Sequence, residues 1–200
     1  MKYTAAPLLQ KVGNIVKDAA LKAKKRHLDV YTDEIKCKSG CNHCCSRPIM
    51  ISIAEAHLIK ESLIKQKRWS EVKRRSMEQE KHKDIDALTW FQMNIKCPVL
   101  DPNTGKCLAY EVRPIVCSTH YVVSNPSSCD PWSAEPIKFN KANMGDIEDA
   151  ANDEINKTLG QSIYSTRLTM FKALNIIDKL VERDGLTLDQ VMVMIGRETS

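Results

Sequence analysis

The sequence predicts a mainly α-helical protein whose helices pack around an irregular, cysteine-rich metal-binding core with little or no strand. Three observations support this fold class. Apolar residues recur at helical spacing in the N-terminal and C-terminal parts of the chain. All eight cysteines lie between residues 37 and 129. Only 7 glycines and 6% aromatic residues are present, which argues against an all-β sandwich.

The chain of 200 residues suits a single domain. We divide it into a helical N-terminal arm (1–36), a metal-binding core (about 37–129) and a helical C-terminal region (146–200). No apolar run reaches the roughly 18 to 20 residues that cross a bilayer, so we expect no membrane association. The N-terminus is too charged for a signal peptide, and we therefore expect a cytoplasmic protein.

The N-terminal arm is predicted to form one amphipathic helix over about residues 6–28. Its basic residues, Arg26 among them, are expected to face solvent. Its apolar positions recur every three or four residues and should face the core. These positions are Leu8, Val12, Ile15, Val16, Ala19 and Ala23.

A second helix is expected to begin at Ile53, because Ser52 and Glu55 fit a capping box. In this motif the serine hydroxyl and the glutamate carboxylate each accept a backbone N–H at the start of the helix. The apolar residues of this helix include Leu58, Leu63 and Ile64.

A third, basic helical stretch is predicted over about residues 70–93. Nine Lys or Arg residues and four Glu lie between Lys60 and Lys83, which accounts for the formal net charge of +5. Such a run is usually the solvated face of a helix. Only Trp69 interrupts it as an aromatic, so no ladder of residues that stack on single-stranded bases is present. Nucleic-acid binding is therefore a weak alternative.

Residues 97–136 are predicted to be irregular, because they hold six of the eight prolines, four cysteines and the turn-like run 101–105. Helical periodicity returns over about residues 147–180, and a short final helix is expected at about 188–195. The apolar positions of the longer stretch are Ile147, Ala151, Ile155, Leu159, Leu168, Phe171, Leu174, Ile177 and Leu180.

The cysteines favour metal binding over disulfides. Disulfide scaffolds are usually short secreted chains, and the adjacent Cys44 and Cys45 cannot pair without strain. The run CKSGCNHCC (37–45) has the spacing C-x3-C-x2-C-C, and Gly40 gives its loop a permissive backbone. It is close to the three-thiolate runs that hold a [4Fe–4S] cluster with a more distant fourth cysteine. Zn²⁺ is the alternative, and eight cysteines could also form two zinc sites.

CKSGCNHCC followed by CPVLDPNTGKCLAYEVRPIVC resembles the YkgJ-like cysteine-cluster family, which is described as zinc- or iron-chelating. The resemblance covers about residues 37–120 and implies a metal centre. It departs from the family at Ser118, where many members have arginine. Some larger relatives resemble S-adenosylmethionine-linked lysine methylases. The matching positions are Cys97-Pro98, Leu100, Gly105, Cys107, Tyr110, Arg113-Pro114 and Cys117.

We predict seven metal ligands from these two groups. Cys129 lies outside the matched motif and is either a free thiol or an additional ligand. His43 and His120 flank cluster cysteines and could replace a thiolate or lie beside the centre. Tyr110 and Arg113 could orient the cluster loop by hydrogen bonds. The predicted ligands are Cys37, Cys41, Cys44, Cys45, Cys97, Cys107 and Cys117.

Three function classes fit these features. The first is a metal-binding accessory factor that presents its helical surface to a protein partner. The second is an enzyme that uses the cluster for redox chemistry or S-adenosylmethionine-linked methyl transfer. Against it, no glycine-rich cofactor loop is found, and His43 stands where radical S-adenosylmethionine enzymes usually have an aromatic residue. The third is a nucleic-acid-associated basic protein.

If the metal is chiefly structural, Cys41→Ser should remove it and expose residues 97–136 to protease, while the helices over 147–180 survive in part. Residues 97–136 have little apolar periodicity of their own, and structural zinc contributes about 10 to 16 kcal/mol in small peptides. Metal analysis and limited proteolysis test this expectation. Full metal content with unchanged protease resistance would show that the first cysteine group is not the anchor.

Overall fold

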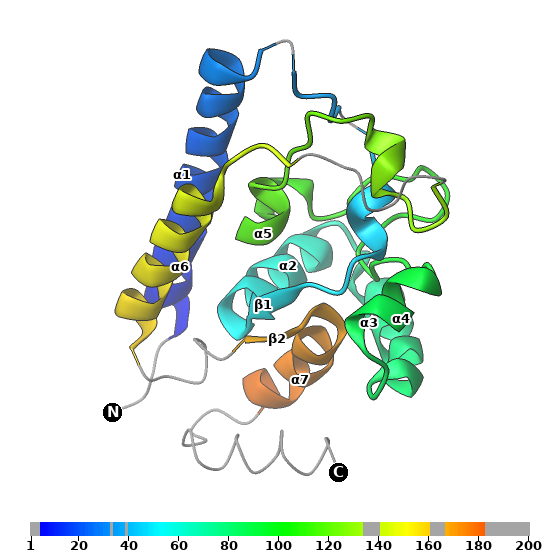
Figure 1. Ribbon diagram of the computed structural model, residues 1–200. Helices are drawn as coiled ribbons and strands as arrows, with labels where there is room; N and C mark the ends of the chain where they lie inside the picture. Colours follow the sequence, from blue (N-terminus) through cyan, green and yellow to red (C-terminus); the bar gives the residue numbers. More distant parts are fainter. Residues whose placement is uncertain (1–4, 33, 39, 134–140, 161–166, 183–200) are drawn as a thin grey trace.

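The computed structural model describes residues 5–32, 34–38, 40–133, 141–160 and 167–182 (Figure 1). The protein is mainly helical, as predicted. Within the described ranges the only paired strands are β1 (Met50–Ser52) and β2 (Arg167–Thr169), which form an antiparallel two-stranded sheet. The final helix expected at residues 188–195 lies outside the described residues.

Helix α1 (Ala5–Val30) and helix α6 (Gly145–Leu159) lie side by side along one edge of the molecule (Figure 1). Their apolar stripes form the first hydrophobic core. Arg26, at one end of the pair, was expected to face solvent. Instead it donates hydrogen bonds to both carboxylate oxygens of Asp146. These bonds lower the pKa of Asp146 to about 2. The buried residues of the pair are Val12, Ile15, Val16, Ala19, Ala23, Ile147, Ala151, Ile155 and Leu159.

Helix α2 (Ile53–Lys65) occupies the middle of the molecule and contributes to two cores (Figure 1). Ala54 belongs to the first core, whereas Ile59 and Leu63 belong to a second core that includes residues of α3 and α7. The predicted capping box is confirmed. The Ser52 hydroxyl accepts from the Glu55 amide at 3.2 Å, and the Glu55 carboxylate accepts from the Ser52 amide at 2.7 Å.

Helix α7 (Met170–Glu182) follows β2 directly and packs against α2 and α3. Leu168, which was expected to be helical, lies in β2 opposite Ile51. The backbone of β1 needs hydrogen-bond partners as it leads from the first cysteine group into α2. Pairing with residues 167–169 supplies them, and this tertiary requirement overrides the helical periodicity around Leu168.

The basic stretch was predicted to be one helix. The structure divides it into three short segments. These are α3 (Trp69–Glu78), the 3₁₀ turn η2 (Gln79–His82) and α4 (Ala87–Gln92). The break has a local cause, because Asp86 accepts hydrogen bonds from the Leu88 and Thr89 amides at 2.9 and 3.0 Å and so begins a new helix.

Residues 97–133 are irregular, as predicted, and hold only single helical turns: η3 (Tyr110–Val112), α5 (Ile115–Ser118) and η4 (Pro126–Cys129). None of the helices in the described ranges combines the length and apolar character that a bilayer crossing requires.

Helix α2 offers a matched pair of substitutions that tests its central position. Ile59 is 0% exposed and Ile64 is 51% exposed. Ile59→Ala should lower the free energy of unfolding by about 2 to 5 kcal/mol, because it leaves a cavity in the second core. Ile64→Ala should change it by less than about 0.5 kcal/mol. Urea unfolding of the two variants measures both values, and equal effects would contradict this placement of α2.

Candidate metal centre

The first cysteine group lies in a loop and the 3₁₀ turn η1 (His43–Ser46), just before β1. Gly40 has a φ of +86°, a conformation that favours glycine, as its predicted role requires. The Cys41 amide then donates to the carbonyl of Lys38 at 3.0 Å, which closes a tight turn. The chain thus reverses between Cys37 and Cys44.

The second cysteine group is built on a tight reversal of the chain between Cys97 and Cys107. The Leu108 amide donates to the Val99 carbonyl at 3.0 Å, so the two arms of the reversal run side by side. Asp101 stabilises its tip by accepting the Asn103 amide at 3.0 Å. Cys97 and Cys107 are consequently neighbours.

Two direct contacts join the cysteine groups. The Cys97 amide donates to the Cys45 carbonyl at 2.6 Å. The Asn42 side chain donates to the Gly105 carbonyl at 3.1 Å. Gly105 has a φ of +66°, which favours glycine, and a Cβ there would lie 2.6 Å from Asn42 Nδ2, so a larger residue would displace the Asn42 side chain from this contact. The structure therefore brings the two predicted groups together.

The pKa values of the adjacent Cys44 and Cys45 are shifted in opposite directions. The Cys45 thiol donates a hydrogen bond to the Cys44 sulfur, which lowers the pKa of Cys44 to about 6 against the effect of burial. The positive charges of Arg47 and Arg113 lower it further. The same hydrogen bond raises the pKa of Cys45, as do burial and the charges of Cys97 and Cys117. Cys44 is thus a thiolate at neutral pH and Cys45 a thiol.

Cys44 is also the neighbour that most of the other cysteines share. Apart from Cys45, burial raises the pKa of five of them, and the negative charge of Cys44 raises each further. The pKa of Cys97 rises to about 12, with the charge of Cys107 also contributing. Cys41 belongs to the same neighbourhood, because its charge raises the pKa of Cys37. The five are Cys37, Cys97, Cys107, Cys117 and Cys129.

Cys129 is the thiol that sequence reasoning left aside. It is 3% exposed at the end of η4, which packs against η1. The His43 ring contacts Asp130 at 3.3 Å between Nδ1 and Oδ2, which ties the two turns together. Burial raises the pKa of Cys129 to about 11, and the charge of Cys44 contributes.

In the part of the chain that the structure describes, no three Cys, His, Asp or Glu side chains are close enough together to hold a metal ion as they stand. None of the eight cysteines forms a disulfide. The cysteines nevertheless affect one another's pKa values, because charges act over several ångströms. A zinc–sulfur bond is only about 2.3 Å long, so direct coordination needs a closer approach. The donor set fits a soft metal, since thiolates select zinc or iron–sulfur clusters over Mg²⁺ or Ca²⁺. Binding would have to draw the sulfur atoms inward.

The residues expected around the centre have distinct surroundings. Burial lowers the pKa of His120 to about 4, and the charge of Arg47 contributes, so its imidazole is neutral at pH 7. The Arg113 guanidinium lies 4.3 Å from the centre of the Tyr110 ring. Its charge lowers the pKa of Cys44. Ser118 is buried and donates to the Ile115 carbonyl at 3.0 Å.

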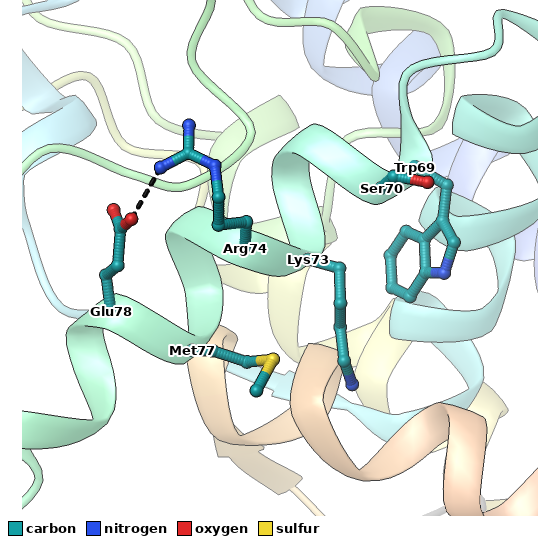
Figure 2. A pocket seen from close by; sticks show the side chains of 6 residues that line it. All are labelled: Trp69, Ser70, Lys73, Arg74, Met77 and Glu78. Atoms are coloured by element: carbon teal, nitrogen blue, oxygen red, sulfur yellow. Dashed lines mark hydrogen bonds and ion pairs between the residues drawn. The ribbon is translucent and has the colours of Figure 1, made fainter.

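The basic stretch carries a shallow hollow on α3, well away from the cysteines along the sequence (Figure 2). Figure 2 shows Arg74 paired with Glu78. Lys73 donates to the carbonyl of Asn175 in α7 at 2.7 Å. Glu71 accepts from Arg68 and Arg75 at 2.6 and 2.8 Å. Several of the basic side chains in this stretch therefore form hydrogen bonds or ion pairs within the protein.

Free cysteines gathered from separate irregular segments, seven of them partly buried and Cys129 buried, are typical of the class of proteins that chelate a soft metal. Residues 36–143 match the family described as "CxxCxxCC: Putative zinc- or iron-chelating domain". The match covers more than half of the chain, which therefore belongs to this family. It extends past His120 and includes Cys129, so the expectation that Cys129 lies outside the family region is wrong. No curated protein and no solved structure matches the chain.

The thiol pKa values predict a steep pH dependence of zinc affinity. At pH 7 Cys44 is ionised, whereas burial keeps Cys97, Cys117 and Cys129 protonated. A four-thiolate site that includes Cys44 must therefore release about three protons on binding. The apparent affinity should rise roughly 1000-fold from pH 7 to pH 8. Competition with a chromophoric chelator of known pH dependence measures this, and a tenfold rise or less would contradict the assignment.

Proposed function

We propose that the protein holds an iron–sulfur cluster of the [4Fe–4S] type through its clustered cysteines and acts as an accessory factor for a protein partner. The observation that carries the proposal is the gathering of thiols from three segments around Cys44, within a zinc- or iron-chelating family. Four ligands would come from the seven predicted cysteines and Cys129. The cluster would supply electron transfer or structural cross-linking at this site.

Backbone donors around the sulfur atoms support a cluster. The Val122 amide donates to Cys37 Sγ at 3.3 Å. Backbone N–H groups of Val99 and Leu100 also lower the pKa of Cys97 against the larger effect of its burial. Hydrogen bonds to sulfur are among the features that set cluster potentials. Zn²⁺ is the alternative, because the same thiolates satisfy its preference for four ligands.

An accessory role is supported by exposed aromatic side chains on the cysteine-rich segment. Trp132 is 71% exposed and Tyr110 is 48% exposed. Tyr and Trp are enriched in protein interfaces, where they bury a large area at low entropic cost. An enzyme that transfers a methyl group from S-adenosylmethionine is the alternative role. Saturable binding of that cofactor, measured by calorimetry, would favour the enzyme.

Anaerobic purification followed by metal and sulfide analysis tests the cofactor. We expect iron, an equal amount of acid-labile sulfide, and broad visible absorbance. The Cys129→Ser variant should hold less iron than the wild type, because this cysteine lies in the neighbourhood of Cys44 and within the matched family region. If the protein is colourless, binds stoichiometric zinc, and takes up no iron or sulfide on anaerobic reconstitution, the site is a zinc site and the cluster assignment is wrong. A protein that binds neither metal would overturn the proposal.

A further inference from the structure

Glu55 is a buried carboxylate that bridges the two cysteine-bearing parts of the chain. It lies in the first turn of α2 and is 3% exposed. Its Oε2 atom accepts from the amide and the hydroxyl of Ser52, at 2.7 and 2.9 Å. Its Oε1 atom accepts from the amide of Ile115 at 3.0 Å. One side chain therefore joins residues that are about sixty positions apart in sequence.

Each end of this bridge is close to predicted metal ligands. Ser52 ends β1, which follows the turn that holds Cys44 and Cys45. Ile115 begins α5, and Cys117 is two residues further on. A helix of one turn is not stable by itself, because nucleation costs more than its few hydrogen bonds return. The Ile115 amide is one of the donors at the start of α5 that have no acceptor within the helix, and the Glu55 carboxyl group accepts it.

We infer that Glu55 is a positioning residue for the metal centre: its carboxylate fixes the start of α5, and with it Cys117, against the segment that carries Cys44 and Cys45. The inference rests on the proposed metal-binding function. Residues that orient ligands in this way typically contribute 10- to 100-fold to metal affinity.

A capping role alone does not explain this arrangement. Gln serves as well as Glu in a capping box, because only one oxygen is needed to accept the N-cap amide. Here both oxygens face N–H donors. An amide at this position could offer its oxygen to Ser52 or to Ile115, but its NH₂ group would then face the other donor. Glu55→Gln therefore loses at least one of the three hydrogen bonds that the carboxylate accepts, while keeping the size of the side chain.

The experiment compares the affinity and visible spectrum of bound Co²⁺ in the wild type, Glu55→Gln and Ser76→Ala. Co²⁺ absorbance reports the number and geometry of thiolate ligands. Ser76 is a matched control, because it is buried and its hydroxyl joins α3 to the Phe171 carbonyl of α7 at 2.9 Å, and neither of these helices carries a cysteine. Urea unfolding of the metal-free proteins measures the stability that each substitution removes.

We expect Glu55→Gln to bind Co²⁺ at least tenfold more weakly with an altered spectrum, and Ser76→Ala to bind within twofold of the wild type. Wild-type affinity and spectrum in Glu55→Gln would overturn the inference. An equal loss in Ser76→Ala at equal stability would overturn it too, because the effect would then be general destabilisation. If circular dichroism shows that Glu55→Gln does not fold, Glu55→Asp, which keeps the charge but shortens the reach, is subject to the same criteria. Failure of the wild type to bind any metal would instead refute the proposed function.

Discussion

The burial of helix α2 on two sides is the constraint on which the arrangement of the protein depends. One face contributes Ala54 to the core formed by α1 and α6, and another contributes Ile59 and Leu63 to the core shared with α3 and α7. The cysteine groups lie where these two cores meet. Cys37 packs against the first core, whereas Cys97 and Cys107 pack against the second. A metal held between them would join the two halves of the protein.

Burial also determines the protonation state of the cysteines when no metal is bound. Several thiolates so close together in a poorly solvated region would repel one another strongly. Burial therefore keeps most of them protonated, while the Cys45 thiol, Arg47 and Arg113 stabilise a single thiolate at Cys44. A metal cation takes the place of these protons. The metal-free site thus keeps most of its cysteines as neutral thiols, whereas the loaded site carries its ligands as anions.

Sequence patterns predicted the features that depend on local interactions. The apolar stripes of α1 and α6 and the Ser52–Glu55 capping box are encoded within a few residues, and each was correct. The features that were missed depend on distant residues. Leu168 is in a strand because residues 50–52 need a partner. The second bond of Glu55, to Ile115, and the position of Cys129 beside Cys44 follow from packing between segments far apart in the chain.

The pairing of α1 with α6 has a consequence for the order in which the chain is made. A ribosome adds about 5 to 20 residues per second, so α6 emerges roughly 6 to 25 s after α1. During that interval the apolar stripe of α1 can pack against residues of α2 and α5 but lacks its partner stripe on α6. The first cysteine group is also complete well before Cys117 exists. The nascent chain therefore exposes part of the apolar stripe of α1 and an incomplete set of cysteine ligands at the same time. Its maturation depends on what covers that stripe and on when metal reaches the cysteines.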